Sequence, residues 1–132
     1  MSDYNLLGVS PQSFISGAAI GQYRVVKLDS TAGQVVVTSA ITDSAIGVAM
    51  ESASAAGELV PIQQFGKAKI VTSGAVSIGD QVMPTGSGSG KCVTASGATA
   101  KSFGVALTAS NGDGEIIEVQ LGVPAINGPA NS

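Results

Sequence analysis

An internal repeat constrains the fold of this chain more than any other feature of its sequence. When the 132-residue sequence is shifted by 57 residues, its two halves align without a gap. Glycine is kept at turn-like positions, and apolar character is kept between them where identity is lost. The identical matches include Ser16-Gly17-Ala18 with Ser73-Gly74-Ala75, Val25 with Val82, Gly33 with Gly90, Gly47-Val48-Ala49 with Gly104-Val105-Ala106, and Gly57-Glu58 with Gly114-Glu115. We therefore expect the two halves to fold into two similar units.

Each half contains the same series of short runs rich in Val, Ile and Thr, separated by Gly, Asp and Ser. Such runs predict β-strands joined by turns, and no window shows the 3.6-residue periodicity of a helix over three turns. The expected strands are residues 23–28, 34–38, 46–50 and 58–65 in the first half, 67–72 leading into the second half, and then 81–83, 91–94, 103–107 and 115–121.

Strands that recur about every ten residues, with turns between them, indicate a barrel or a sandwich. Two repeats are too few for a solenoid. We therefore predict an all-β fold: a compact β-barrel or sandwich of two pseudo-symmetric repeats of short strands, in which two similar sheets pack face to face. The β domain is expected to span residues 16–122, with repeat units at 16–66 and 73–122, between an extended N-terminal arm at 1–15 and an irregular C-terminal tail at 123–132.

The N-terminal arm carries several large apolar side chains, and two of the five aromatic residues of the chain are among them. Two interpretations of the arm stay open: it packs as a strand on the protein's own sheet, or it lies on a neighbouring protein. In the second case its large side chains are the candidate contact residues. These are Tyr4, Leu6, Leu7, Val9 and Phe14.

Aromatic residues amount to only 4% of the chain, and there is no Trp. The core is therefore expected to consist of small aliphatic side chains, which gain less free energy per residue on burial than aromatic ones do. We expect self-association or a partner surface to add stability.

The charge of the chain is small and scattered. Charged residues make up 11% of the sequence, and the net charge is −3. Of the six cations, only Lys67 and Lys69 lie close together in the sequence, whereas nucleic acids and anionic membranes are bound by clusters of Lys and Arg. No stretch approaches the roughly 20 apolar residues that cross a bilayer, and the first residues lack the basic and apolar regions of a signal peptide. We therefore expect a protein made and folded in the cytoplasm that binds neither nucleic acid nor membrane.

The residue types of common catalytic and metal sites are missing from the sequence. The chain has no His, which excludes Ser-His-Asp triads, Cys-His nucleophiles and His-based zinc sites. The single cysteine, Cys92, is expected to be a small buried residue in a strand. The Gly-rich segment 85–92 departs from the phosphate-binding loop motif, and segment 111–115 departs from a calcium loop because Ile116-Ile117 follows at once. We predict no enzymatic activity, no cofactor and no metal site.

Residues 21–122 resemble the capsid cement proteins of tailed bacteriophages, which are short proteins of the virion. The resemblance lies in an ordered series of motifs: YRVVKLDSTAGQVVV (23–37), AIGVAM (45–50), AAGELVPIQQFGKAKIV (55–71), SIGDQVMP (77–84), SFGVAL (102–107) and GDGEIIEVQL (112–121). It implies an all-β fold, no enzymatic activity, and attachment to an assembled capsid shell, often as trimers or dimers at local symmetry axes. The resemblance carries over no catalytic residue and no particular contact residue.

This resemblance leads to the hypothesis of a capsid decoration, or cement, protein that binds the outer surface of a phage head and stabilises it by bridging capsid subunits. The expected partner is the major capsid protein, and a homo-oligomer is expected, with a trimer favoured over a dimer. The five apolar residues of the arm would then contact the capsid or a neighbouring subunit. Two alternatives stay open: another virion component, such as a tail or fibre part, and a carbohydrate-binding β module. Sugar sites favour exposed Trp and Tyr platforms, and this chain has no Trp and two Tyr.

Overall fold

The computed structural model describes residues 12–86, 89–97 and 101–122, and within these ranges it consists of ten β-strands joined by turns, without a helix. The strands are β1 (Gln12–Ser16), β2 (Val25–Leu28), β3 (Gln34–Val37), β4 (Ala45–Ala49), β5 (Leu59–Gln63), β6 (Gly66–Val71), β7 (Gln81–Pro84), β8 (Cys92–Thr94), β9 (Gly104–Ala106) and β10 (Ile116–Leu121). The predicted all-β fold is confirmed, and each of the nine expected strands overlaps one of β2 to β10.

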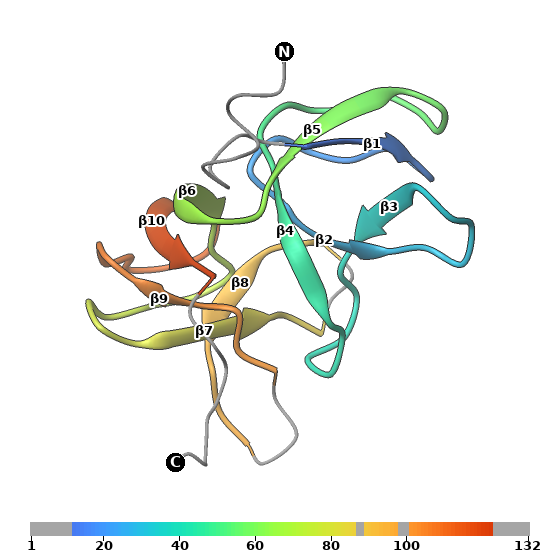
Figure 1. Ribbon diagram of the computed structural model, residues 1–132. Helices are drawn as coiled ribbons and strands as arrows, with labels where there is room; N and C mark the ends of the chain where they lie inside the picture. Colours follow the sequence, from blue (N-terminus) through green and yellow to red (C-terminus); the bar gives the residue numbers. More distant parts are fainter. Residues whose placement is uncertain (1–11, 87–88, 98–100, 123–132) are drawn as a thin grey trace.

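The strands form two five-stranded units that follow one another along the chain (Figure 1). Strands β1 to β5 make a closed barrel in the order β1-β3-β2-β4-β5, in which β5 pairs again with β1. Strands β6 to β10 make a sheet in the order β6-β10-β9-β7-β8. We call these the first unit and the second unit.

The two units share their strand connectivity, so the repeat in the sequence is a repeat in structure. β10 pairs with β6 and β9 as β5 pairs with β1 and β4, and β7 pairs with β8 and β9 as β2 pairs with β3 and β4. They differ at one seam. In the first unit β1 and β3 pair in parallel, with Ser16 opposite Val35, whereas the corresponding contact in the second unit is the isolated bridge between Thr72 and Cys92. The second unit is thus the same barrel without a pairing of β6 with β8. We call this opening between β6 and β8 the seam.

The gapless alignment of the two halves is wrong by one residue in its first part. Ser16 and Thr72 are equivalent, because each is buried and each donates its N–H to the carbonyl oxygen of the glutamate that precedes the last strand of its unit. They lie 56 residues apart, whereas Gly47 and Gly104, which occupy equivalent places in β4 and β9, lie 57 apart. The predicted match of Ser16 with Ser73 is therefore wrong, and Ser16 matches Thr72 instead.

The change of offset comes from the length of one turn. The turn between the paired ends of β2 and β3 comprises residues 29–34, and the corresponding turn between β7 and β8 comprises residues 85–91, which is one residue more. As a result Val82 is the equivalent of Val26 and not of Val25, since both Val26 and Val82 pair with the glycine of the next strand in their sheet.

Each unit has a hydrophobic core of small aliphatic side chains, rather than one core shared by two sheets face to face. The core of the first unit consists of Ile20, Val26, Val35, Ala49, Ala53, Val60 and Ile62, with Phe14, Val37 and Ile46 packed against it. The core of the second unit contains Ala68, Ile70, Val76, Val82, Cys92, Ala106, Ile117, Val119 and Leu121, together with Val25 and Val48. Full burial of an aliphatic side chain of this size contributes about 1.5–3 kcal/mol.

Residues of the first unit close the seam of the second unit. The Val71 N–H in β6 donates to the Tyr23 carbonyl oxygen at 3.1 Å, and the Val25 N–H donates to the Gly90 carbonyl oxygen, just before β8, at 2.7 Å. The segment 23–25 therefore contacts both sides of the seam. The buried side chain of Val25 belongs to the core of the second unit although the residue stands in β2. Part of the second core is thus supplied by the first unit.

Replacing Val25 by Ala is expected to lower the free energy of unfolding by about 2 kcal/mol, because it removes buried methyl groups from a core that spans both units. Leu28→Ala on the same strand is the matched control: Leu28 is 55% exposed, and its replacement is expected to cost less than about 0.5 kcal/mol. Urea unfolding followed by circular dichroism measures both variants. Equal effects of the two substitutions would contradict the shared core.

Candidate functional site

The described residues hold no constellation that is typical of a reactive site. In these ranges no three His, Cys, Asp or Glu side chains gather into a group that could hold a metal ion. No helix of the described segments has the length and apolar character that a membrane crossing requires.

Cys92 lies in the core of the second unit, as expected from the sequence, with its side chain fully buried. Burial disfavours the charged thiolate and raises the pKa of the thiol to about 12. The thiol therefore stays protonated at neutral pH, and a protonated, buried thiol is a poor nucleophile.

Asp43 orders the turn that precedes β4. Its Oδ2 accepts hydrogen bonds from the Ser39 N–H at 2.7 Å and the Ala40 N–H at 2.9 Å, and it pairs with the Lys27 Nζ at 3.0 Å. Partial burial opposes ionisation of this carboxyl, but the two amides and Lys27 outweigh that effect and lower its pKa to about 2. Asp43 therefore stays charged at neutral pH and holds a turn together.

A second carboxylate contact is repeated in both units. The Glu58 carboxylate accepts hydrogen bonds from the Ser54 N–H at 3.1 Å and the Ser54 hydroxyl at 2.6 Å, and these bonds lower its pKa. The Glu115 carboxylate accepts a hydrogen bond from the Asn111 N–H at 3.0 Å in the same place of the second unit. Both glutamates hold the loop before the last strand in place through these hydrogen bonds, so they are structural residues.

Exposed apolar side chains recur at equivalent positions of the two units. Leu59 is 68% exposed and Ile116 is 53% exposed, and each begins the last strand of its unit. Met50 and Leu107, which directly follow β4 and β9, are a second exposed pair of equivalent residues. The molecule therefore presents similar apolar side chains twice, once on each unit.

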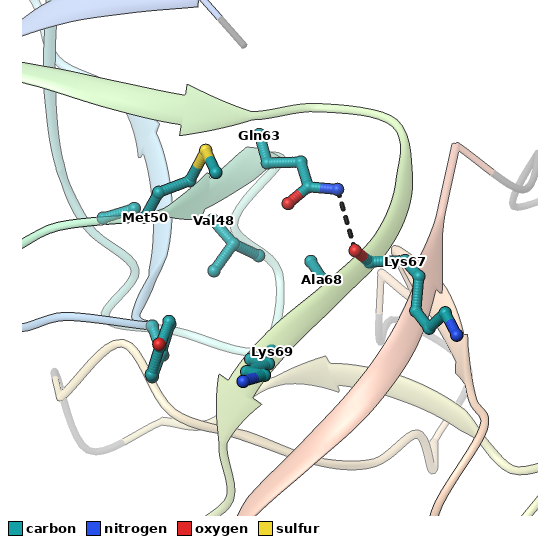
Figure 2. Close-up of a pocket in the computed structure, with 8 residues that line it drawn as sticks. Val48, Met50, Gln63, Lys67, Ala68 and Lys69 are labelled. Atoms are coloured by element: carbon teal, nitrogen blue, oxygen red, sulfur yellow. Dashed lines mark hydrogen bonds between the residues drawn. The ribbon is translucent and has the colours of Figure 1, made fainter. Parts of the chain in front are cut away.

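A groove with a volume of about 270 Å³ lies where the two units meet (Figure 2). It is bordered by the end of β4, the end of β5 and the first half of β6. Its lining consists of Val48, Ala49, Met50 and Ala68 and of the polar residues Tyr23, Gln63, Lys67 and Lys69. The Lys69 Nζ lies 6.0 Å from the centroid of the Tyr23 ring, which is the outer limit of a cation–π contact.

Tyr23 has an unusual backbone conformation at this groove. Among the described residues it is the non-glycine residue with a positive φ, 64°. Its equivalent in the second unit is Gly79, with a φ of 90°. The equivalence follows from the backbone, since the Tyr23 N–H donates to the Ala49 carbonyl oxygen and the Gly79 N–H to that of Ala106, both at 2.8 Å. The left-handed conformation costs a residue with a side chain about 1–2 kcal/mol.

Four of the five contact residues predicted from the sequence lie outside the described residues: Tyr4, Leu6, Leu7 and Val9. Phe14 is described. It lies half-buried in β1 and packs against the core of the first unit. The end of the predicted arm, residues 12–15, thus lies in β1 and pairs with the protein's own sheet, as the first of the two interpretations had it. Contact between the rest of the arm and a partner stays a prediction.

The groove was not predicted from the sequence. Its one sequence signal is the pair Lys67 and Lys69, whose spacing places both side chains on one face of a strand. No local pattern indicates that this strand, β6, lies at the edge of its sheet beside the end of β4, because that position depends on how the two units pack.

Comparisons with known proteins give the following matches. A family model described as phage cement protein matches residues 25–121. Among solved structures, the chain is similar to the crystal structure of the head fiber gp8.5 N base in bacteriophage phi29, with a TM-score of 0.66 and 14% sequence identity over 83% of this chain and 91% of that chain. At this level of identity the likeness establishes a shared fold. No curated protein matches the sequence.

Acidification is expected to remove the stability that Asp43 contributes. Its pKa in the folded state, about 2, lies below the ordinary value of 3.8, so this contribution is complete at neutral pH and is lost as the pH falls through these two values. Asp43→Asn is therefore expected to lower the free energy of unfolding by about 1 kcal/mol at pH 7, after allowance for solvent screening, and by much less at pH 2.

Urea unfolding of wild type and variant at the two pH values measures this difference. Asp113→Asn is the control, because Asp113 forms an exposed ion pair with Lys91 at 3.0 Å, and such pairs contribute little. If Asp43→Asn costs the same at both pH values, the electrostatic explanation is wrong.

Proposed function

Because this chain belongs to the phage cement protein family, we propose that it binds the outer surface of a phage head and stabilises the head by bridging neighbouring capsid subunits. The match of the family model over residues 25–121 is the observation that carries this proposal. Members of this family are structural proteins of the virion and not enzymes, and the chain is a virion structural protein of this kind.

The mechanism of stabilisation is additive contact. A protein that touches two capsid subunits at once makes the departure of either subunit break contacts to both. The exposed pairs Leu59/Ile116 and Met50/Leu107 support this mechanism, since they offer similar apolar contacts on each unit. Linking two weak contacts in one molecule raises the overall affinity by about 10²–10⁴-fold when both can form together.

We further propose that the partner is the major capsid protein and that the chain acts as a homo-oligomer, with a trimer favoured over a dimer. A closed oligomer multiplies the number of capsid contacts per particle. The low charge of the chain fits contacts made by backbone hydrogen bonds and small apolar side chains. The arm residues Tyr4, Leu6, Leu7 and Val9 lie N-terminal to β1 in the sequence and are proposed to add contacts to the capsid or to a neighbouring copy.

A second candidate function is the base of a head fibre. It is favoured by the similarity to the phi29 structure, whose title describes a head fiber base and which is covered over 91% of its length. In that case the chain would attach a further protein to the head. Labelled antibodies against the chain, applied to intact particles, distinguish a protein spread over the head surface from one that carries projecting fibres or one that lies on the tail.

Heads that carry the protein are expected to rupture at a higher temperature than heads that lack it, because each bound copy adds contacts that must break. Genome release during heating, followed with a DNA-binding dye, measures the rupture temperature. Adding purified protein back to depleted heads is the control and should restore the higher value. Equal rupture temperatures with and without bound protein would contradict stabilisation.

Deleting residues 1–11 is expected to lower the occupancy of the protein on heads and to leave its unfolding in urea unchanged. The deletion has to end before Gln12, because β1 pairs with both β3 and β5 and closes the barrel. Phe14→Ala is the matched variant within the strand, and it is expected to lower stability because Phe14 packs on the core. Occupancy that does not change on deletion would remove the arm from the capsid contact.

A further inference from the structure

The groove between the two units borders the edge of β6 that faces away from β10, and residues of the first unit already bond to part of this edge. Among the described strands β6 pairs with β10 alone, so backbone groups of every second residue face the groove. The Lys67 carbonyl oxygen accepts a hydrogen bond from the Gln63 Nε2 at 2.9 Å, as Figure 2 shows, and the Val71 N–H donates to the Tyr23 carbonyl oxygen at 3.1 Å. Lys69 lies midway between Lys67 and Val71, so its backbone N–H and C=O face the groove as well. An edge strand presents such groups to an incoming extended chain.

The groove combines positive charge with an apolar floor. Val48 and Ala68 are buried beneath it, and Met50 stands exposed at its rim. The side chains of Lys67 and Lys69 are exposed on one face of β6, and these are the two cations that lie closest together in the sequence. Lys67 directs its ammonium group toward Glu118 of β10, 3.9 Å away, in an exposed ion pair that contributes little, whereas Lys69 is the cation beside Tyr23 at the groove.

Tyr23 gives an independent sign that the groove has a use. The turn before β2 requires a positive φ, and glycine meets this requirement at the equivalent place of the second unit, Gly79. A tyrosine in the same conformation is strained, so the fold alone favours glycine here. The ring of Tyr23 lines the groove and lies beside Lys69. A strained side chain retained at the wall of a groove indicates a contact that offsets the strain.

From these observations we propose that the groove receives an extended acidic segment of the capsid surface, an inference that rests on the function proposed above. The backbone of the segment pairs with the N–H and C=O of Lys69. The carboxylate of an Asp or Glu in the segment lies against the ammonium group of Lys69, and an apolar neighbour contacts Met50. The ring of Tyr23 covers one side of the bound segment and shields the charge pair from water.

A second copy of this chain is a poorer occupant of the groove. Pairing β6 with β6 of another copy places Lys67 and Lys69 against the same residues of the partner strand, and like charges in facing positions destabilise a sheet. Lysines on an edge strand are a common means of preventing such self-pairing. An acidic segment instead makes a favourable contact with Lys69.

The test measures binding of purified protein to heads that lack it, by co-sedimentation at low salt. Lys69→Glu is expected to weaken binding about tenfold or more, because the charge that faces the acidic segment is reversed. Lys101→Glu is the matched control, since Lys101 is exposed and its Nζ donates to the Ser44 hydroxyl before β4, at the opposite end of that strand from Met50. This control is expected to bind as wild type does.

Tyr23→Gly supplies a readout that a purely structural role would not give. Glycine adopts the required φ without strain, so the free energy of unfolding is expected to stay the same or to rise, while binding to heads weakens. If wild type, Lys69→Glu and Tyr23→Gly all bind to heads equally well, the groove proposal is overturned and the proposed function still stands.

Absence of binding by wild type would overturn both proposals. A third outcome is that Lys69→Glu loses binding and also sediments as a smaller oligomer. That result would assign the groove to contact between copies and would overturn its assignment to the capsid.

Discussion

The hydrogen bonds that Tyr23 and Val25 make with Val71 and Gly90 determine how the two halves of the molecule hold together. A barrel of five short strands has a small interior, and this one is filled with Val, Ile and Ala. The first unit closes on itself through β1 and β3. The second unit stays open at the same place, and an open seam with unpaired backbone groups costs about 1–3 kcal/mol for each group left buried without a partner. The segment of the first unit meets this need and adds an apolar side chain.

The sequence allowed the strands and the repeat to be predicted because both depend on local signals. Runs of Val and Ile favour strands, and Gly33, Gly57, Gly90 and Gly114 have the positive φ that turns require. The seam could not be predicted, since it depends on contacts between residues such as Val25 and Gly90 that lie far apart in the sequence. The alignment error has a related cause: identical residues suggested one constant offset, whereas hydrogen-bond register decides which residues are equivalent.

The same limit applies to the candidate site. The pair of lysines was visible in the sequence, but the edge position of β6 and the nearby end of β4 were not. Tyr23 shows the point most clearly. At the offset of 57 residues it falls on Asp80 and attracts no attention, whereas at the structural offset of 56 it falls on Gly79 and stands out as a strained residue. The repeat thus becomes informative about function only after the backbone has fixed its register.

Many polar side chains of the described residues form hydrogen bonds that hold turns. The surface features that remain are suited to contact with other proteins. Asp43, Glu58 and Glu115 accept hydrogen bonds from neighbouring backbone amides, and Cys92 is buried. Two kinds of surface are then distinct. Each exposed apolar pair has one residue on each unit. These residues alone would allow a partner to bind either unit in a similar way. The groove exists only at the junction, so it can define a single orientation.

The core that the second unit shares with Val25 and Val48 also determines how the molecule moves as a whole. Two domains on a flexible linker swing independently, and holding one leaves the other free. Here the interior of one unit contains side chains of the other, so the two units form one body and cannot swing apart without exposing that core. If one end of such a body is anchored to an ordered shell, its other end is held at a constant height and angle. Peptides grafted onto the hairpins of that distant end would then form a regular lattice over the particle.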